Sequence, residues 1–521
     1  MNRRAASLAR LRSEDFDVLI AGAGINGAAS AAALAARGLK VALVDRGDFA
    51  GQTSSASSNL VWGGIKYLES YEFGLVRGLC LSRNRLMNHY PDNVREMRFY
   101  ALHTRDFRHG GAALRLGTWA YWMMGSGRTQ PPRALSLGRL MHEEPAVSLE
   151  GLRGGVEYSD ACLPEGDARF VLGLIRAALG FGAVAANYVE VLSVRREGGL
   201  WLARLRRRDA EEEFPLRARL LVNACGPYAE AFNLAGGLPF RHRHLFSKGV
   251  HLVLPKLLSG RRILAFPASD GRPFFLMPLG QRTVAGTTDT PLDSPEAAVN
   301  EEDRRFILEQ VNRRLRLPEP LGPRDIIAER CGVRPLAVAA DGPQGSGDWL
   351  HLSRRHVFEE HPALGLLAVY GGKISDCLNI GEEALRATAR ALPQGPALTG
   401  PRWFGEPGSG ERQDFLRRAM ETLARGPCPS PPRKAAERLW RRYGSEASAL
   451  LRLMEADPAS GTEAIPGSGV LLAEADHAAT AEMVVRPEDF LRRRTNLALE
   501  YKAGELEASP GYGALLKRLG V

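Results

Sequence analysis

The chain has 521 residues, 45% of them hydrophobic and 25% charged, so it is long enough for two or three domains and has an ordinary globular composition. The formal net charge of +10 is compatible with a nucleic acid, an anionic membrane surface or an anionic substrate as partner. The basic clusters form no single tail and do not alternate with aromatic residues, so we expect no nucleic acid partner.

The cysteines and the N-terminal residues limit which cellular compartments are compatible with the sequence. The six cysteines form no CxxC pair and have no histidine cluster beside them, so we expect reduced thiols, no metal and no disulfide framework. The first sixteen residues contain arginines but lack the apolar core of a secretory signal. No run of about 18 apolar residues predicts a transmembrane helix.

Residues 16–51 have the pattern of a strand, a glycine-rich turn, a helix and a second strand. DFDVLIAG is the first strand, GINGAASAAALAARG is an alanine-rich helix that ends at Gly38, and KVALVDRG is the second strand. Parallel neighbouring strands need such a crossover helix. This stretch therefore predicts a βαβ unit.

A GxGxxG motif occupies the turn of this unit. Gly22, Gly24 and Gly27 allow backbone N–H groups to approach a pyrophosphate at the N-terminus of the helix. Asp45 ends the second strand, where an acid accepts hydrogen bonds from a ribose. We therefore predict a dinucleotide site; the alternative is a tight turn with a surface aspartate.

The next segments alternate between helical and strand patterns. Residues 75–150 are predicted to be mostly helical, and residues 167–182 form an amphipathic helix with Asp167 as its N-cap. Residues 184–222 alternate like strands, and RLLVNACG is a buried strand that ends in glycine.

The second half of the body changes its pattern. Between residues 245 and 290, the short runs GVHLVLP, RILAFP, PFFLMPL and TVAGTTD predict an antiparallel sheet. Asn300 and Asp303 have capping-box spacing before a helix that runs to about Leu315. Strands return before LLAVYGGK, and a helix follows.

This arrangement favours FAD over a nicotinamide cofactor, because the chain leaves its nucleotide fold, builds a second domain and returns twice. Residues 391–413 are rich in proline and glycine, which predicts a linker, and only helical patterns follow it. The predicted divisions are a body at 14–395 (FAD parts about 14–80, 160–235 and 325–392; substrate domain about 81–159 and 236–324), a linker at 396–410 and a helical domain at 411–521.

Several stretches, taken together and in order along essentially the whole chain, carry a resemblance to a known family. They are GAGINGAASAAALAARG, TSSASSNLVWGGIKYLESYEF, VEYSDACLPEGDARFV, LVNACGPYAE, KGVHLVLP, VAGTTDT, CGVRPL, YGGKIS and RPEDFLRRRTNLAL. With these stretches the sequence resembles the FAD-dependent, quinone-linked glycerol-3-phosphate dehydrogenases of the aerobic type, within the D-amino-acid-oxidase-like flavoproteins.

The resemblance implies an α/β (α+β) fold with a Rossmann-type FAD domain, an antiparallel-sheet substrate domain and a C-terminal helical cap. It implies oxidation of sn-glycerol 3-phosphate to dihydroxyacetone phosphate, with hydride transfer to the flavin and electrons passing to a quinone or to oxygen. It also implies a cytoplasmic protein, peripheral on the inner face of the membrane, and a homodimer. The Trp- and Met-rich segment 114–127 then faces lipid and a quinone entry; the alternative is core packing.

Site residues follow from the same resemblance. Arg334 and Lys373 match catalytic positions, and Lys66, Tyr67, Trp62 and Arg354 match substrate-binding positions. The cofactor-binding positions are Gly22, Gly24, Asn26, Gly27, Asp45, Arg46, Ser54, Ser55, Ser58, Gly63, Gly64, Ala224, Gly226, Gly372, Lys373, Ile374 and Ser375. The TTD at 287–289 is predicted to be structural.

Three departures from the family pattern fall on the substrate side. Trp62 stands where the family has histidine, Lys66 stands where it has arginine, and Asp376 lies in a stretch that departs from the family's LTTYR. An enzyme of the same fold that acts on another 2-hydroxy acid, amino acid or polyol phosphate therefore remains an alternative. A basic nucleic-acid-binding or flavin-carrying protein without turnover is the third hypothesis, and only the charge supports it.

Overall fold

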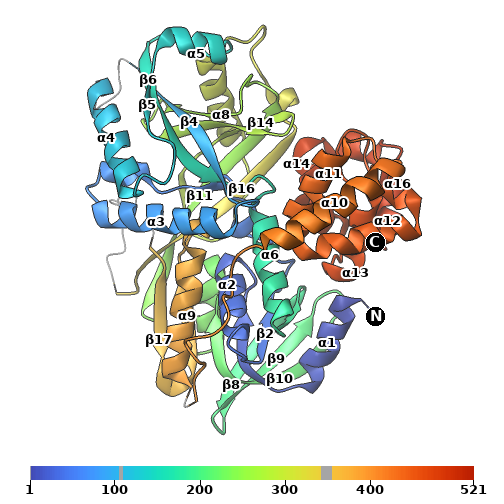
Figure 1. Ribbon diagram of the computed structural model, residues 1–521. Coiled ribbons are helices and arrows are strands. Elements are labelled where there is room, and N and C mark those ends of the chain that lie inside the picture. The colour runs from blue at the N-terminus through green and yellow to red at the C-terminus, as the bar shows by residue number, and fades with distance from the viewer. Residues whose placement is uncertain (1, 105–109, 342–354, 393) are drawn as a thin grey trace.

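The computed structural model describes residues 2–104, 110–341, 355–392 and 394–521. One β-sheet lies in the lower half of the molecule in Figure 1 and a second lies in the upper half, with C-terminal helices beside both. The predicted fold class, a Rossmann-type part with an antiparallel second part and a helical C-terminus, is confirmed.

The first sheet has the strand order β17-β18-β10-β1-β2-β7, and β18, β10, β1, β2 and β7 run parallel. Ile20 of β1 pairs with Leu43 on one side and Val222 on the other, and Val222 faces Leu367 of β18. The chain thus returns twice to its nucleotide fold, as predicted. The bounds are β1 Phe16–Ala21, β2 Val41–Val44, β7 Val184–Ala186, β8 Val189–Glu197, β9 Leu200–Arg207, β10 Glu212–Asn223, β17 Val357–His361 and β18 Leu366–Tyr370.

Helices α2, α6 and α9 lie side by side on one face of this sheet (Figure 1). The buried alanines of α2, such as Ala28 and Ala32, leave room for the neighbouring helices to approach closely. A further helix, α1, buries Leu8 and Leu11 against the first sheet, although sequence analysis considered this stretch only as a targeting signal. The bounds are α1 Arg3–Ser13, α2 Ile25–Ala35, α6 Asp167–Gly180 and α9 Cys377–Ala391.

The second sheet has the order β15-β11-β14-β13-β12-β4-β6-β3, with β16 beside β11 and β5 beside β6. The antiparallel runs predicted between 245 and 290 are its strands β11 to β14. The bounds are β3 Leu60–Val61, β4 Arg95–Thr104, β5 Arg133–Leu135, β6 Leu152–Cys162, β11 His242–Pro255, β12 Ile263–Pro267, β13 Pro273–Leu279, β14 Arg282–Gly286, β15 Thr290–Leu292 and β16 Ala328–Ala339.

The prediction that residues 75–150 are mostly helical is wrong for β4 and β5. Helices α3, α4 and α5 do form there, but β4 runs between them through the middle of the second sheet. Its side chains alternate between two cores, with Phe99 facing α3 and α4 and Tyr100 facing the opposite core. The bounds are α3 Phe73–His89, α4 Gly110–Met124 and α5 Leu137–Glu143.

The opposite face of the second sheet packs against α5 and α8 (Glu301–Arg314). The capping box predicted at the start of α8 is present: the Asp303 N–H donates to Asn300 Oδ1 (2.9 Å) and the Asn300 N–H donates to Asp303 Oδ2 (3.0 Å). The face toward α3 and α4 is the one that carries the candidate substrate residues.

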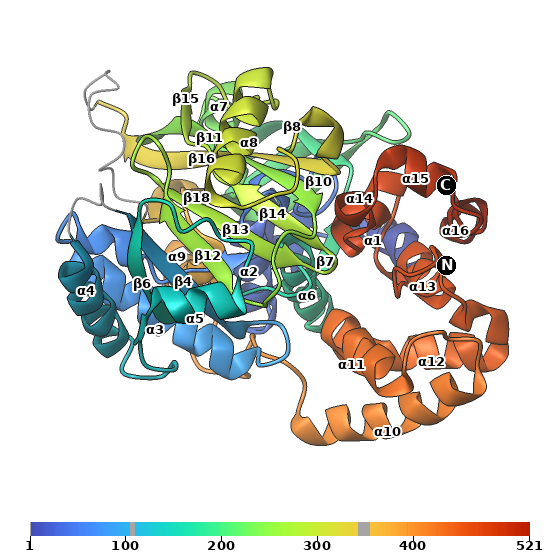
Figure 2. The same ribbon diagram turned by 90° about the horizontal axis from the view of Figure 1, so that it is seen from above.

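The C-terminal helices form a lobe with its own apolar core (Figure 2), which includes Leu439, Trp440 and Leu451. No helix among the described residues combines the length and the apolar character needed to span a bilayer. The bounds of these helices are α10 Ser409–Arg425, α11 Pro432–Tyr443, α12 Ala447–Ala456, α13 Leu472–Ala481, a π-helical turn Asp489–Arg494, α14 Leu497–Glu500, α15 Ala503–Glu507 and α16 Tyr512–Leu519; a further helix of the body, α7, spans Ala229–Ala235.

Candidate active site

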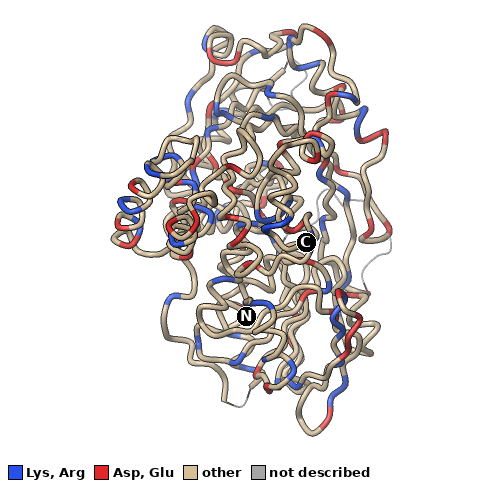
Figure 3. The backbone as a smooth tube through the Cα atoms, turned by 90° about the vertical axis from the view of Figure 1, so that its right-hand side faces the viewer, with Lys and Arg blue, Asp and Glu red and all other residues tan. Residues whose placement is uncertain are grey.

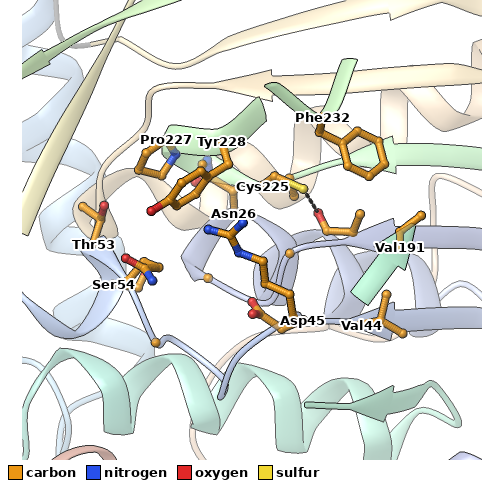
Figure 4. Close-up of a pocket in the computed structure, with 18 of the residues that line it drawn as sticks. Asn26, Val44, Asp45, Thr53, Ser54, Val191, Cys225, Pro227, Tyr228 and Phe232 are labelled. Atoms are coloured by element: carbon orange, nitrogen blue, oxygen red, sulfur yellow. Dashed lines mark hydrogen bonds between the residues drawn. The ribbon is translucent and has the colours of Figure 1, made fainter. Parts of the chain in front are cut away.

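A cavity of about 360 Å³ opens at the carboxyl ends of the parallel strands β1, β2, β10 and β18. Ligands of open α/β sheets bind at this end of the strands. Figure 4 shows Asn26, Asp45 and Tyr228 around the cavity, each contributed by a different segment of the chain. The cavity therefore lies where the glycine motif predicts a dinucleotide.

The glycine motif has the geometry that a dinucleotide requires. Gly22 has a φ of 100°, and a Cβ on it would lie 2.4 Å from the carbonyl oxygen of Ala224. A Cβ on Gly27 would lie 1.9 Å from the Gly22 carbonyl oxygen, so helix and turn pack in direct contact. Helix α2 begins after Gly24, and its first N–H group, on Ile25, donates to Ser54 Oγ (3.0 Å).

Asp45 and Arg46 form the next wall of the cavity. The Asp45 carboxylate accepts the N–H groups of Ala23 (2.7 Å) and Gly47 (2.9 Å), and burial raises its pKa to about 6. The Arg46 guanidinium lies 3.9 Å from the ring centre of Tyr228. Sequence analysis did not single out Tyr228, although it lies within GPYAE, nor Val191, for which an ordinary strand pattern gave no signal.

Not all predicted cofactor residues line this cavity. Those that do are Gly22, Gly24, Asn26, Asp45, Arg46, Ser54, Ala224, Gly226 and Gly372. Those outside its lining are Gly27, Ser55, Ser58, Gly63, Gly64, Lys373, Ile374 and Ser375. The Asn26 amide donates to the Gly371 carbonyl (2.9 Å), whereas its Oδ1 is buried and accepts no hydrogen bond from the described residues. The predicted cofactor residues that the structure brings together around the cavity are therefore mainly those near the glycine motif.

The serine-rich segment after Thr53 connects the two sheets. Thr53 Oγ1 donates to the Val333 carbonyl on β16 (2.7 Å), and the Ser57 N–H donates to Asp167 Oδ2 (2.8 Å). Asp167 therefore lies in the first turn of α6 and holds this segment rather than capping the helix as predicted, because the N-cap is Gly166. The Ser55 hydroxyl donates to the Gln52 carbonyl (3.2 Å), and Ser55 itself does not line the cavity.

Lys66, Tyr67 and Lys373, which sequence analysis assigns to the substrate or the catalytic step, lie together. Strand β3 pairs with β6, and the chain then turns through Trp62, Gly63 and Gly64. Lys373 Nζ donates to the Tyr67 hydroxyl (3.2 Å), and Lys66 Nζ lies 5.7 Å from the Tyr67 ring centre. Two segments some 300 residues apart are thus joined. Trp62, which replaces the family's histidine, packs on Tyr67 and Phe275 (ring centres 6.4 and 6.3 Å apart).

Arg334 lies on β16 beside Pro335, which lines the cofactor cavity. Its guanidinium pairs with Asp289 Oδ1 (3.1 Å), donates to Thr287 Oγ1 (2.9 Å) and covers Gly249. The 287–289 stretch therefore fixes the position of Arg334. Arg354 lies outside the described residues.

Sequence analysis missed His251, which is buried on the same face of the second sheet. It pairs across β11 and β14 with Gly286, which also pairs with Phe275, so His251 and Phe275 share one face. Neither of its ring nitrogens has a hydrogen-bond partner among the described residues. Burial, with Arg330 and Arg334 nearby, holds its pKa well below the usual range. A lone histidine in an apolar strand gave no clear signal.

Asp376 turns toward a histidine. Its carboxylate contacts His356 Nδ1 (2.6 Å), and His356 Nε2 contacts Glu383 (2.8 Å). These carboxylates raise the pKa of His356 to about 9 despite its burial, so the imidazole is protonated at neutral pH. The protonated imidazole of His356 thus lies against the carboxylate of Asp376, the residue that departs from the family pattern.

Comparisons with known proteins agree with this geometry. Residues 17–375 match the family described as FAD dependent oxidoreductase, and residues 408–519 match the C-terminal domain of alpha-glycerophosphate oxidase. The chain belongs to the FAD-dependent oxidoreductases. The glycerol-3-phosphate dehydrogenase of Pseudomonas aeruginosa is 34% identical over 497 residues (94% of this chain, 93% of that protein), which confirms the resemblance.

Two further relatives are similar over nearly the whole length. The D-erythritol 1-phosphate dehydrogenase of Brucella abortus is 32% identical over 511 residues (95% of this chain, 97% of that protein). The solved glycerol-3-phosphate dehydrogenase of Bacillus halodurans, complexed with FAD, has a TM-score of 0.73 at 24% identity and covers 100% of this chain and 94% of that one. The latter supports the fold.

The residues present fit FAD, the cofactor of the family. The glycine turn would hold the pyrophosphate, Asp45 the ribose, and the Arg46–Tyr228 pair the adenosine end. Gly371 and Gly372 both have positive φ values, 65° and 101°, and close the cavity toward Lys373. The isoalloxazine ring would therefore extend toward Lys373 and the second sheet.

Proposed function

We propose that this chain oxidises the secondary hydroxyl of a polyol phosphate, sn-glycerol 3-phosphate first, to a ketone, giving dihydroxyacetone phosphate from that substrate. One observation carries the proposal: Lys66, Tyr67 and Lys373 converge beside the FAD cradle in a chain whose full-length relatives are named polyol-phosphate dehydrogenases. Lysine and arginine are the side chains that hold a phosphate dianion.

The substrate phosphate is bound by Lys66 with help from Tyr67 and Lys373, and Arg334 orients the carbon end. Lys373 is already positioned by the Tyr67 hydroxyl, and Arg334 by Asp289 and Thr287, so little side-chain freedom is lost on binding. Lysine holds a phosphate as a point charge and lacks the fork of arginine.

His251 is the residue on this face that can accept the hydrogen bond of the substrate hydroxyl, because its ring nitrogens have no partner among the described residues and burial keeps the imidazole neutral by holding its pKa well below the usual range. It lies on the face of the second sheet that carries Arg334 and Phe275, and the ring of Phe275 packs against Trp62. When bound, FAD supplies the hydride acceptor at this site.

Anaerobic flavin bleaching tests this function directly. We expect millimolar sn-glycerol 3-phosphate to bleach the flavin of the holoenzyme, and unphosphorylated glycerol, lactate and glycine to leave it oxidised. Faster bleaching by lactate or glycine than by any polyol phosphate would favour the other enzymes of the same fold and would contradict the proposal.

D-erythritol 1-phosphate is the second candidate substrate. The Brucella abortus relative carries that name, and this chain departs from the glycerol-3-phosphate pattern at Trp62 and Lys66. Comparing kcat/KM for the two phosphates decides between them. A preference for erythritol 1-phosphate of tenfold or more would assign that substrate.

The electrons pass to a quinone at a membrane, and helix α4 is the surface that meets it. Leu116, Trp119 and Met123 of α4 are 73%, 45% and 61% exposed and lie at helical spacing on one side. Tyr121 of the same helix is buried, so core packing accounts for that part of segment 114–127. Helix α4 lies far from the C-terminal lobe in Figures 1 and 2. The oligomeric state stays a prediction.

Vesicle sedimentation tests the membrane contact. We expect the chain to sediment with vesicles that contain anionic phosphatidylglycerol, and the double variant Leu116→Glu/Met123→Glu to stay in the supernatant. Leu234→Glu is the matched control, because Leu234 is 61% exposed on another part of the molecule. Equal binding by the wild type and the double variant would contradict this surface.

A further inference from the structure

An ion pair is buried directly under the turn that carries the substrate-side residues. Arg83 of α3 and Asp160 of β6 are 1% and 0% exposed, and Arg83 Nη1 lies 3.0 Å from Asp160 Oδ1. The Tyr121 hydroxyl of α4 donates to Asp160 Oδ2 (2.6 Å). A strand and two helices thus contribute to one closed cluster, which the proposed mechanism does not use.

This cluster holds the backbone of the turn. The Gly63 N–H donates to Asp160 Oδ1 (3.1 Å), and a Cβ on Gly63 would lie 2.3 Å from the Tyr121 hydroxyl and 2.8 Å from Cys80 Sγ. Any residue other than glycine at position 63 would displace the cluster. The position of the Gly63 amide is therefore determined by Asp160 and Tyr121 together.

The turn carries this constraint to the substrate side. Gly64 has a φ of 79°, and its carbonyl accepts the N–H of Tyr67 (2.9 Å). The Tyr67 hydroxyl in turn accepts a hydrogen bond from Lys373 Nζ (3.2 Å). An unbroken series of short contacts runs from Tyr121 through Asp160 and the turn to Lys373.

Stability alone does not account for such a pair. Removing two charges from water costs several kcal/mol per ion, and packed apolar residues often stabilise a fold equally well. Arg83 also donates to Asn84 Oδ1 through Nε (3.2 Å) and Nη2 (3.0 Å), and Asn84 donates to the Gly125 carbonyl (2.7 Å). A cluster with so many satisfied bonds specifies one geometry.

We propose that Asp160 is a positioning residue of the active site: held by Arg83 and Tyr121, it fixes Gly63 and thereby sets Tyr67 and Lys66 against Lys373. The inference rests on the proposed function, because the phosphate of the substrate binds where these side chains meet. Residues of α3 and α4 thereby affect substrate affinity through the Gly63 turn.

The test is Tyr121→Phe, which removes one hydrogen bond to Asp160 and keeps the ring. Tyr100→Phe is the matched control, because the Tyr100 hydroxyl also donates to a carboxylate, that of Glu143, but on the opposite face of the second sheet. Both variants lose one phenol–carboxylate hydrogen bond, fully buried at Tyr121 and only partly buried at Tyr100, so the melting temperature should fall in both and further in Tyr121→Phe.

Only Tyr121→Phe should weaken substrate binding. We expect its KM for sn-glycerol 3-phosphate to rise about tenfold, with a smaller change in kcat and unchanged FAD content. Asp160→Asn should raise KM further, since it keeps an acceptor for Gly63 but removes the charge opposite Arg83. A KM for Tyr121→Phe within twofold of wild type would overturn the inference.

A second readout separates this inference from the proposed function. Titration with inorganic phosphate, followed by the flavin absorbance spectrum, gives a dissociation constant without turnover. If no polyol phosphate bleaches the wild type but phosphate binds it, the proposed function fails, and a tenfold weaker phosphate constant in Tyr121→Phe still supports the positioning role. An unchanged phosphate constant in Tyr121→Phe, or no phosphate binding by the wild type, would overturn that role.

Discussion

Arg334 is the residue whose loss should affect turnover most. Its guanidinium is fixed by Asp289 and Thr287 on the face of the second sheet that also carries His251. We expect Arg334→Ala to lower kcat/KM by about 100-fold or more while FAD remains bound, because a charge-assisted contact to the substrate is lost. Stopped-flow flavin reduction measures this change.

Arg304→Ala is the matched control for this variant. Arg304 of α8 is likewise paired with carboxylates, those of Glu301 and Glu329, where Arg334 pairs with Asp289, but its helix covers the opposite face of the second sheet. It should therefore reduce its flavin at nearly the wild-type rate. A kcat/KM close to wild type in Arg334→Ala would disprove the role of Arg334.

Asp45 predicts a pH dependence of FAD binding. Burial raises its pKa to about 6, above its usual value near 4, so the carboxylate becomes neutral as the pH falls through 6. Ribose hydroxyls donate to the charged form. FAD affinity of the apoprotein should therefore be highest above pH 7 and fall toward pH 5.

Fluorescence titration of the apoprotein with FAD measures this dependence. Asp45→Asn should bind FAD more weakly and lose the pH dependence between 5 and 8, because its side chain does not titrate. If the wild type binds FAD equally well at pH 5 and pH 8, Asp45 does not hold the ribose in its charged form.

At the scale of elements, the π-helical turn Asp489–Arg494 contacts Asp48 beside the cofactor cavity. Arg494 contacts both oxygens of Asp48 (2.5 and 2.8 Å), and Asp48 lies two residues after Arg46 of the cavity wall. Arg493 contacts the same carboxylate. We propose that the C-terminal helices, beyond the linker at 396–410, form a domain that steadies the FAD site through this contact.

The variant Arg494→Ala tests whether this contact with Asp48 supports FAD binding. We expect the dissociation constant for FAD to rise about tenfold, because the buried Asp48 carboxylate keeps only part of its charge compensation. Arg518→Ala is the control, since Arg518 pairs with Asp457 and Asp476 inside the C-terminal lobe. The same FAD affinity in both variants would exclude a steadying role for the turn.

The sequence predicts elements well where pattern and local chemistry agree. The parallel strands read as continuous apolar runs, and the glycine motif and the Asn300 capping box have local causes, so they were predictable. Strand β4 was not, because its pairing with β12 and β6 depends on segments far away in the chain. Helix α1 was missed because its apolar face is short.

The candidate site was predictable only in part for the same reason. The cavity residues near Gly22 and Asp45 follow from a local motif, whereas the substrate residues followed only from family resemblance. His251 and Asp160 gain their meaning from neighbours on other strands and helices, which spacing in the sequence does not reveal. The contact between His356 and Asp376 is likewise long-range.

At the scale of the whole molecule, the site is assembled from separate stretches of the chain. The cavity is lined by segments near Gly22, Asp45 and Ala224 of the first sheet and by Pro335 of β16 in the second sheet, so a bound cofactor would contact both sheets. Lys and Arg are interspersed with Asp and Glu along the chain (Figure 3), so the net charge of +10 is spread rather than gathered in one footprint.

This assembly predicts that FAD stabilises the fold as a whole. Removal of FAD should lower the melting temperature by several degrees, since a ligand at 100 times its dissociation constant adds about 2.7 kcal/mol. Differential scanning calorimetry of the holoprotein and apoprotein measures this. An equal melting temperature for the two forms would show that the cofactor does not bridge the sheets.

We propose that Lys66, Tyr67 and Lys373, which converge beside the FAD cradle, together with Arg334 on β16, make this chain a polyol-phosphate dehydrogenase. Anaerobic addition of sn-glycerol 3-phosphate to the yellow holoenzyme tests this proposal most directly. We expect loss of the oxidised-flavin absorbance within the mixing experiment, for that substrate or D-erythritol 1-phosphate. A flavin that dithionite reduces but neither phosphate bleaches would contradict it.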